Sequence, residues 1–494
     1  MQEVERRTGS SQEASGEVAR RLALALLALQ EQQQRNADLL AEITAIKRSR
    51  SWRTTALLRR VRSFLRPERL GAPPLEPATA GNGRLLADPT RLLMQRAGVD
   101  MPAARRATDA GPGPRLLVDV TELALLDHGA GIQRVVRRLL VELLLAPAAG
   151  LRTEPVRLAA TGGYVHARAF LARMLGMDAA DAGEDTPVLA GPGDRLLALD
   201  LLRDRAPEAL VAWRELRSRG VRISVVVYDL LPMSNPEWFP DGMPARFAAW
   251  LDLVLKHADQ ALCISRTVAE ELREQSLARG GSCHPQIRSF GLGADLEGWL
   301  LPVRRLPLPS TDQPRFLVVG TIEPRKGHAQ ALAAFEGLWA CGSQVQLLIA
   351  GRYGWGVEEL AQRLRSHPEA GKRLLWIEDA DDAVLAASYR GSTALLAPSR
   401  GEGFGLPLVE AAAHGLPVLA RDLPVFHEVG GAGVDYFSGD SPAQLQAAIE
   451  DWLHRWETGG IAVPDVVAAR SWRDSARALL LTIDALGASA PGMP

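Results

Sequence analysis

The sequence is poor in cysteine, and this limits the kinds of site that it can form. Its 494 residues include three cysteines, Cys263, Cys283 and Cys341, and no two of them form a Cys-x-x-Cys pair. Such spacing excludes a disulfide framework and a cysteine zinc site. It is also typical of a protein that works in a reducing compartment.

Long apolar runs and charge of one sign are missing too. No run of 18 apolar residues occurs, so we expect no transmembrane helix. The first residues, MQEVERRTGSSQE, lack the apolar core of a signal peptide, and we therefore expect a cytoplasmic protein. The formal net charge is −1, which argues against nucleic acid as a partner.

What the sequence does contain is a long alternation of short apolar runs with amphipathic stretches, starting at Arg115. Strands that alternate with helices predict parallel sheets with helices on both faces. The apolar runs are Leu116–Val120, Val188–Leu199, Ile223–Tyr228, Ala261–Ile264, Ile287–Phe290, Phe316–Val319, Leu347–Ala350, Leu374–Ile377, Ala394–Ala397 and Val418–Ala420.

A proline-rich break, RRLPLPSTDQP, divides this series into two halves of similar size. The sequence therefore predicts an α/β protein with two doubly wound, Rossmann-like domains that face a cleft, preceded by a helical segment. The predicted parts are a helical segment (1–70), a linker (71–114), the first domain (115–307), the second domain (308–470), a C-terminal helix that packs back toward the first domain (471–486) and a tail (487–494).

The helical segment has two halves with different patterns. Residues 18–46 form a seam at alternating spacings of four and three that is apolar except for Gln32 and Asn36, which predicts a short coiled coil and a homo-oligomer. A single amphipathic helix lying on the protein fits the same pattern. Residues 47–69 hold nine Lys/Arg and one acid together with Trp52 and Phe64. This composition suits an anionic membrane surface and hence a peripheral membrane protein, and it equally suits a solvated basic linker helix.

Three loops follow predicted strands, where doubly wound sheets bind their ligands. The loop before residue 131 is rich in glycine, and Gly131 lets a ligand approach the backbone. In GTIEPRKGH, the adjacent cations Arg325 and Lys326 precede a helix and offer a fork and a point charge to phosphate oxygens. The alternative for the glycine loop is a plain tight turn. The alternative for Arg325 and Lys326 is that they are solvated surface cations.

The third loop, SRGEGFGLPLVEAAAHGLPVLA, combines a glycine turn with the start of a helix and two acids. The backbone N–H groups of Gly403, Phe404, Gly405 and Leu406 can bind a diphosphate, which Arg325 and Lys326 would neutralise without a metal. Carboxylates accept hydrogen bonds from hydroxyl groups. Glu402 in the turn therefore suits a sugar, and Glu410 on the helix suits a ribose.

These motifs resemble those of a known family. GEGFGLPLVEAAAHGLPV is similar to the Glu-x7-Glu signature of the retaining group 1 glycosyltransferases, which have the GT-B fold, and GTIEPRKGH resembles their donor-phosphate loop. HGAGIQRVVRRL, VYDLLP, DQALCISRTVAEEL and SWRDSARALLLTI also resemble family segments, so that the resemblance covers residues 115–486. SRSWRTTALLRR resembles a segment that precedes the catalytic domains of some bacterial polysaccharide glycosyltransferases.

The resemblance implies transfer of a hexose, mannose or rhamnose, from a nucleotide-diphosphate sugar to a glycan or lipid-linked acceptor in bacterial surface polysaccharide synthesis. It implies catalytic roles for Glu402, Lys326, Arg325 and Asp229. The implied donor-binding residues are Gly131, Gly320, Thr321, Arg325, Lys326, Ile377, Glu378, Glu402, Gly403, Phe404, Gly405, Leu406 and Glu410, with the base near Ile377 and Glu378. No cofactor is expected.

The sequence departs from the family pattern at two positions, and two other functions remain open. Thr321 stands where the family often has arginine, and Tyr228 stands where it often has histidine. A catalytically silent nucleotide-sugar-binding subunit and a sugar-nucleotide epimerase share the fold. The motif Asp379-Ala-Asp381 could hold a metal, but it more closely fits the start of a helix, and we expect no metal.

Overall fold

The structure is a computed structural model that describes residues 113–127, 131–145, 151–160, 162–174, 184–280, 285–294, 313–461 and 470–484. The predicted helical segment, nearly all of the linker and the predicted tail lie outside these residues. Both sheets described below belong to one compact unit, Met101–Ala167 with Asp185–Pro494. Helix α8 (Arg168–Met174) belongs to a separate unit and is described by itself.

The first sheet has seven strands in the order β3-β2-β1-β4-β5-β6-β7. All neighbouring strands are parallel except β2 and β3. The order reverses between β1 and β4, which makes their carboxyl ends the expected ligand edge. The strands are β1 (Arg115–Asp119), β2 (Arg152–Leu158), β3 (Tyr164–His166), β4 (Arg195–Ala198), β5 (Arg222–Val227), β6 (Gln260–Cys263) and β7 (Gln286–Ser289).

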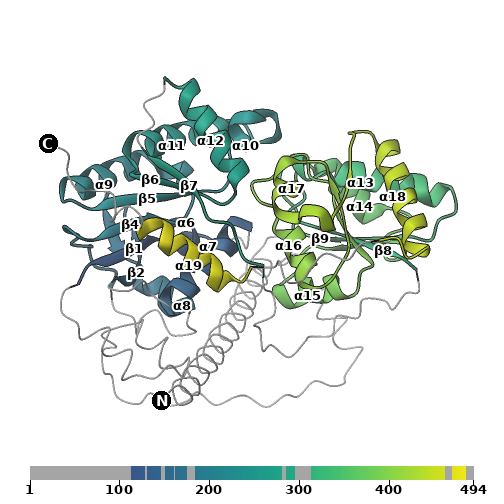
Figure 1. Cartoon of the computed structure of the whole chain (residues 1–494), viewed down its shortest axis with the longest axis horizontal. Helices are drawn as coiled ribbons and strands as arrows, with labels where there is room; N and C mark the ends of the chain where they lie inside the picture. Colours follow the sequence, from purple (N-terminus) through teal and green to yellow (C-terminus); the bar gives the residue numbers. More distant parts are fainter. Residues whose placement is uncertain are drawn as a thin grey trace, which may run out of the picture. The chain divides into compact units, whose positions relative to one another are not determined.

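Helices cover both faces of this sheet, as Figure 1 shows for α9, α11 and α12 on one side and α7 and α19 on the other. The last helix packs on α7, and its carbonyl groups accept hydrogen bonds from Arg195 (3.2 Å) and Gln260 (3.0 Å). The helices are α6 (Thr121–Leu125), α7 (Gly131–Leu145), α9 (Ala206–Ser218), α10 (Leu231–Ser234), α11 (Met243–His257), α12 (Arg266–Ala278) and α19 (Trp472–Asp484), with 3₁₀ turns η2 (Arg203–Arg205) and η3 (Pro236–Trp238).

The second sheet has six parallel strands in the order β10-β9-β8-β11-β12-β13. Its switch point lies between β8 and β11. The strands are β8 (Arg315–Val319), β9 (Gln346–Ala350), β10 (Leu374–Ile377), β11 (Ala394–Ala397), β12 (Val418–Arg421) and β13 (Asp435–Phe437). The helices are α13 (His328–Ala340), α14 (Glu358–Ser366), α15 (Asp382–Arg390), α16 (Leu406–Ala413), α17 (Pro424–Gly430) and α18 (Pro442–Glu457), with 3₁₀ turns η4 (Pro324–Lys326) and η5 (Gly431–Gly433).

The central positions of strands β8, β9, β11 and β12 are apolar because both faces of the second sheet are covered. Successive side chains point to opposite faces of a strand. Phe316 and Val318 therefore enter one core with Phe335 of α13, whereas Leu317 enters the other core with Leu408 of α16. This double burial fixes the strand register, because a shift by one residue would exchange the two faces.

The predicted α/β class with two doubly wound sheets is confirmed, with differences at the sheet edges. Strands β2, β3 and β13 were not predicted. β2 carries Arg152, Glu154, Pro155 and Arg157 among its seven residues, so that its apolar pattern is weak. The predicted run Val188–Leu199, which is interrupted by Gly-Pro-Gly-Asp-Arg, forms a strand over Arg195–Ala198 alone. Within the described part of the chain, no helix is long and apolar enough to cross a membrane.

Candidate active site

The loop after β8 lies against the loop after β11. Gly327 has a positive φ of 72°, and a Cβ atom there would lie 2.2 Å from the carbonyl oxygen of Pro398. The backbone N–H of Arg400 donates to the carbonyl oxygen of Arg325 (2.7 Å). These contacts require glycine at position 327 and bring Arg325 and Lys326 next to Glu402.

Glu402 forms ion pairs with both predicted cations. Its Oε1 lies 2.5 Å from Nζ of Lys326, and its Oε2 lies 3.2 Å from Nη1 of Arg325. Nη2 of Arg325 lies 2.7 Å from Glu323, and its Nη1 also donates to the carbonyl oxygen of Gly401 (3.0 Å). The two loops predicted from the sequence thus form one buried ionic cluster at the switch point of the second sheet.

The charges in this cluster determine its protonation. Burial alone would raise the pKa of Glu402, but the charges of Lys326 and Arg325 lower it to about 2, so that Glu402 is ionised at neutral pH. Burial raises the pKa of Glu323, and Arg325 opposes the shift. An incoming anion would therefore meet cations that already have a carboxylate partner.

Asp229 lies at the same cluster, although it comes from the first sheet. It follows β5, and its Oδ1 accepts a hydrogen bond from the backbone N–H of Leu231 (3.2 Å). A Cβ atom on Gly403 would lie 3.0 Å from Cβ of Asp229 and 1.9 Å from the carbonyl oxygen of Tyr228. Burial raises the pKa of Asp229, and the charge of Arg325 opposes the shift. The structure therefore brings Asp229, Arg325, Lys326 and Glu402 together.

Tyr228, the departure from the family pattern, is directed away from this cluster. The side chain is buried, and its hydroxyl group donates to the carbonyl oxygen of Leu199 (2.7 Å) within the first domain. Tyr228 contributes its backbone to the contact with Gly403 and not its phenol. The phenol therefore does not replace the family's histidine.

The glycine turn leads directly into α16. Gly405 is the N-cap residue with a φ of 95°, and a Cβ atom there would lie 2.7 Å from the ring of Phe426. Phe404 is buried, and Leu406 is the first residue of the helix. The first N–H groups of a helix have no partner within the helix, so this end can bind an anion.

Glu410 occupies a second buried ionic cluster. Its Oε2 accepts a hydrogen bond from the hydroxyl group of Tyr389 (2.7 Å), and its Oε1 lies 2.7 Å from Nη2 of Arg134 on α7. Arg134 also lies 3.3 Å from Asp382, which is 2.6 Å from Arg138. Arg134 was not among the residues predicted from the sequence. Its spacing of four from Arg138 on α7 was the available signal.

Of the remaining predicted donor-binding residues, some lie next to the Glu402 cluster and others are not in contact with it. Gly320, with a φ of 139°, is in contact with Lys326, because a Cβ atom there would lie 3.6 Å from Cε of that side chain. Thr321 follows it and lies against Gly354. Gly131 is the first residue of α7. Ile377 ends β10, and Glu378 forms an exposed pair with Arg365 (2.9 Å), so the structure shows neither in contact with Glu402.

The Asp-x-Asp motif starts a helix, as predicted. Asp381 caps α15 by accepting a hydrogen bond from the backbone N–H of Val384 (2.8 Å), and Asp379 lies 3.2 Å from Arg352. Among the residues that the structure describes, no group of three or more histidine, cysteine and acidic side chains is arranged to hold a metal ion.

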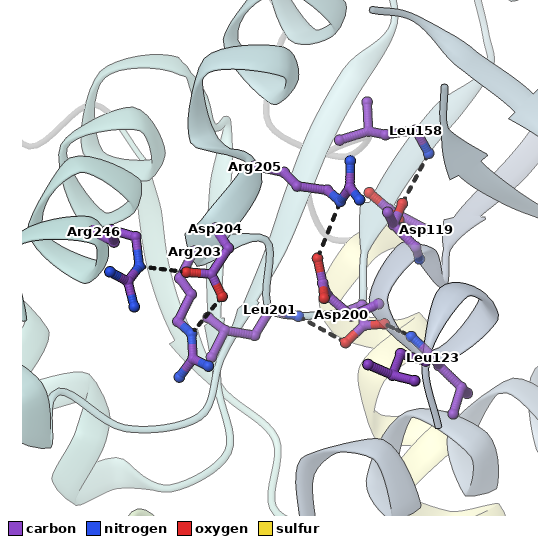
Figure 2. Close-up of polar contacts among 12 residues, drawn as sticks. Asp119, Leu123, Leu158, Asp200, Leu201, Arg203, Asp204, Arg205 and Arg246 are labelled. Carbon is purple, nitrogen blue, oxygen red and sulfur yellow. Dashed lines mark hydrogen bonds and ion pairs between the residues drawn. The ribbon is translucent and has the colours of Figure 1, made fainter. Parts of the chain in front are cut away.

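Asp119 and Asp200, two acids at the edge of the first sheet, were also not predicted from the sequence (Figure 2). Burial raises the pKa of Asp119 to about 6 and that of Asp200 to about 7. Asp200 accepts hydrogen bonds from the backbone N–H groups of Leu123 (2.7 Å) and Leu201 (2.9 Å), while Asp119 accepts from Thr121 and Tyr164. Thr121 and Leu123 belong to α6, so both acids hold that short helix in place.

His328 is a further residue that sequence reasoning missed. It begins α13 directly after Lys326 and Gly327, it is 1% exposed, and neither ring nitrogen has a hydrogen-bond partner among the described residues. Burial, with a smaller contribution from the charge of Lys326, lowers its pKa to about 3. His328 is therefore a neutral group beneath the cationic loop.

We expect His328 to make the stability of the second domain depend on pH. Between pH 6.5 and 3 the unfolded chain binds a proton that the folded chain excludes, so stability falls as the pH drops through about 6.5. From pH 7 to pH 5 the wild type should lose about 2 kcal/mol more of its unfolding free energy than His328→Leu, measured by denaturant titration. The exposed His454, changed to leucine, is the control; equal pH slopes in wild type and His328→Leu would contradict the assignment.

Comparison with a family model and comparison with individual relatives agree on the kind of protein that this chain resembles. Residues 304–459, which contain the whole Glu402 cluster except Asp229, match the family model for glycosyl transferases group 1. The serotype-specific mannosyltransferase WbdA of Escherichia coli is 38% identical over 386 residues, which cover 76% of this chain and 47% of that protein. The phosphatidyl-myo-inositol mannosyltransferase of Mycobacterium leprae (strain TN) is 42% identical over 134 residues, 26% of this chain and 34% of that protein. This chain thus spans about half the length of the WbdA proteins that it matches.

Solved structures agree with the fold. A sucrose-phosphate synthase of Thermosynechococcus elongatus matches with a TM-score of 0.52 at 19% identity, over 76% of this chain and 100% of that chain. The N-terminal domain of the Candida albicans trehalose-6-phosphate phosphatase matches with a TM-score of 0.55 at 13% identity, over 76% and 97%. The predicted GT-B fold is confirmed, and residues 304–459 of the chain match the group 1 glycosyltransferase family.

Proposed function

We propose that the chain is a retaining glycosyltransferase that moves a hexose from a nucleotide-diphosphate sugar to a growing glycan or lipid-linked acceptor in bacterial surface polysaccharide synthesis. The observation that carries this proposal is the cluster of Glu402 with Lys326 and Arg325 at the N-terminus of α16. The names of the relatives support mannose as the hexose, with rhamnose as the second choice.

The residues of the cluster have separate roles in this reaction. The bond between the anomeric carbon and the diphosphate oxygen breaks, and its electron pair leaves with the nucleoside diphosphate. Lys326, Arg325 and the N–H groups that open α16 stabilise that charge from fixed positions. The acceptor hydroxyl oxygen forms the new bond to the same face of the sugar, and its proton passes to the departing diphosphate oxygen.

Glu402 acts on the donor sugar once the diphosphate has arrived. Because its pKa is about 2, it is an ionised acceptor for sugar hydroxyl groups at neutral pH. Phosphate oxygens can take over part of the coordination of Lys326 and Arg325, which frees the oxygens of Glu402. Asp229, beside Gly403, lies on the acceptor side of the same cluster and is proposed to contact the reacting groups there.

The nucleoside is proposed to extend from the diphosphate loop toward β10. Strand β10 is two strands away from β8, a distance of about 10 Å. The base would then lie near Ile377 and Glu378, and the ribose would lie near Glu410. Because both oxygens of Glu410 have protein partners, ribose hydroxyl groups would have to replace Arg134 there.

Removal of the Lys326 charge tests the proposal directly. We expect Lys326→Ala to lower turnover by about 10² to 10³, the effect of losing one fixed donor to the developing charge. The exposed Lys372, changed to alanine, is the matched control and should retain wild-type turnover. The assay measures transfer from a panel of nucleotide sugars, with and without EDTA.

Activity should survive EDTA. Complete loss of transfer in EDTA, with recovery in Mn²⁺, would contradict the metal-independent mechanism. It would instead support a metal site at Asp379 and Asp381. Conversion of a free sugar nucleotide without any acceptor would instead favour an epimerase, and binding without turnover would favour a silent subunit.

The two glutamates should separate in calorimetry with a nucleoside diphosphate alone. Glu410→Ala should weaken binding, because it removes the proposed ribose acceptor. Glu402→Ala should leave this binding nearly intact while it removes transfer, because no sugar is present in the titration. Equal weakening by both substitutions would contradict the division of roles.

We further propose that residues 18–46 pair the chain with a second copy and that residues 47–69 attach it to an anionic membrane surface. The second stretch can contribute about 1 kcal/mol per Lys/Arg near such a surface, and salt screens this attraction. An enzyme on the membrane would meet a lipid-linked acceptor at a raised local concentration.

Two truncations separate these roles. Removal of residues 1–46 should lower the oligomeric state in light scattering but retain co-sedimentation with anionic liposomes. Removal of residues 1–70 should abolish both, and transfer to a short acceptor in solution should persist because the residues of the proposed site all follow residue 115. A monomeric full-length chain that ignores anionic liposomes at low salt would contradict both parts.

A further inference from the structure

A polar pocket of about 430 Å³ adjoins the candidate active site, and the proposed donor chemistry does not use it. Its volume falls in the range of small-ligand pockets, about 300–1,000 Å³. Its lining includes Asn235, Trp238, Arg400, Arg421, Asp422 and Asp440. Asn235 and Trp238 come from η3 and the residue before it, whereas the other residues follow β11, β12 and β13 at the carboxyl edge of the second sheet.

The pocket shares a wall with the active site. Arg400 precedes Glu402 by two residues, so their Cα atoms are at most about 7 Å apart. Gly401 lies between them, and a Cβ atom there would lie 2.8 Å from the ring of Trp238. The pocket therefore adjoins the turn that carries the carboxylate proposed to hold the donor sugar.

The hydrogen bonds of Arg421 hold the wall of the pocket together. Its guanidinium group donates to the carbonyl oxygens of Pro398 (3.2 Å) and Gly439 (2.8 Å), to Asp440 (3.0 Å) and to Gln330. These bonds tie the end of β11 to the segment after β13. Because every nitrogen of this buried group has a protein partner, Arg421 has little capacity left for a phosphate.

The charges that face the pocket cancel. Arg400 lies 3.8 Å from Asp440, which also pairs with Arg421. Asp422 is 2.7 Å from a ring nitrogen of His427 and accepts a weak bond from the hydroxyl group of Ser438 (3.4 Å). Two arginines balanced by two aspartates provide donors and acceptors for the hydroxyl groups of an uncharged ligand.

Trp238 supplies an aromatic wall in a fixed position. Its backbone carbonyl oxygen accepts a hydrogen bond from the indole of Trp355 (3.0 Å), and Phe239 stacks on the same indole with ring centroids 6.2 Å apart. The side chain of Trp238 is partly exposed, and Arg400 lies 5.8 Å from its ring centroid. The C–H face of a hexose can pack on such a ring while its hydroxyl groups reach the polar residues around it.

We propose that this pocket binds an uncharged hexose unit of the glycan acceptor, the unit whose hydroxyl group receives the transferred sugar or its direct neighbour. Trp238 packs against the sugar ring, and Asn235, Asp422 and Asp440 bond its hydroxyl groups. This assignment rests on the proposed glycosyltransferase function and adds to it the chemical class of the acceptor and the residues that select it.

Two variants test the pocket from opposite directions. Trp238→Ala removes the aromatic wall, and Ser438→Trp fills the pocket from an exposed position. The matched controls are Trp456→Ala, an exposed tryptophan on α18, and Ser366→Trp, an exposed serine on α14. The full-length chain is assayed with GDP-mannose as the donor and a short mannose oligosaccharide as the acceptor, each at varied concentration.

Both pocket variants should raise the acceptor KM at least tenfold and leave the donor KM within about twofold of wild type. Slow hydrolysis of the donor in the absence of acceptor should be unchanged, which shows that the variants remain folded and bind the donor. An unchanged acceptor KM in both variants, or a donor KM that rises as much as the acceptor KM, would overturn the assignment.

A binding experiment keeps this test independent of the proposed reaction. In saturation-transfer NMR without any donor, the wild type and both controls should bind the mannose oligosaccharide, and Trp238→Ala and Ser438→Trp should not. If wild type binds the oligosaccharide but transfers nothing from any nucleotide sugar, the proposed function fails while the pocket stands. Stronger competition by mannose 6-phosphate than by mannose would overturn the assignment to an uncharged unit.

Discussion

The ion pairs of Glu402 with Lys326 and Arg325 are the interaction on which the rest of the site depends. A buried charge without a partner is costly, and loss of one partner from a buried pair typically destabilises a protein by about 3–5 kcal/mol. The loop after β8 contributes the cations and the loop after β11 contributes the carboxylate, so neither loop can move away without exposing or isolating a charge. The contact of Gly327 with Pro398 sets how closely the two loops approach.

This cluster also prepares the site for an anion. Glu402 holds Lys326 and Arg325 in position, and its low pKa keeps that arrangement at all pH values well above 2. A diphosphate would find the cations and the N-terminus of α16 already oriented, so little reorganisation would accompany charge development. His328, neutral and buried under the same loop, adds no competing charge at neutral pH.

The proposed positions of the nucleoside and of the acceptor sugar have different surroundings near the Glu402 cluster. Arg134, Tyr389 and Asp382 surround Glu410 on the side where the nucleoside is proposed. The pocket beside Trp238 lies on the other side of the Arg400–Glu402 segment and carries balanced charge. The cationic part of the site therefore suits the phosphorylated donor, and the neutral part suits a sugar. The same short segment of chain serves both because Gly401 and Gly403 allow the close approach of Trp238 and Tyr228.

The fold class and the two loops of the second sheet could be predicted from the sequence, because both depend on local patterns. Three features can be recognised without tertiary information. They are the apolar strands that are buried on both faces, the glycine turn before α16, and the adjacent Arg325 and Lys326. Strands β2 and β13 were missed for the converse reason, since their short and partly polar segments are strands through pairing with a neighbour rather than through their own pattern.

Which charged side chains pair with one another could not be predicted, because it depends on the packing of distant segments. The sequence separates Glu402 from Lys326 by 76 residues and Glu410 from Arg134 by many more, so no spacing rule relates them. The partners of Glu410, the burial of His328, the backbone contact of Tyr228 and the pocket beside Trp238 all arise from packing between distant segments. The physical reason is that ion pairing and desolvation depend on distance and burial, which a chain acquires only when its strands and loops come together.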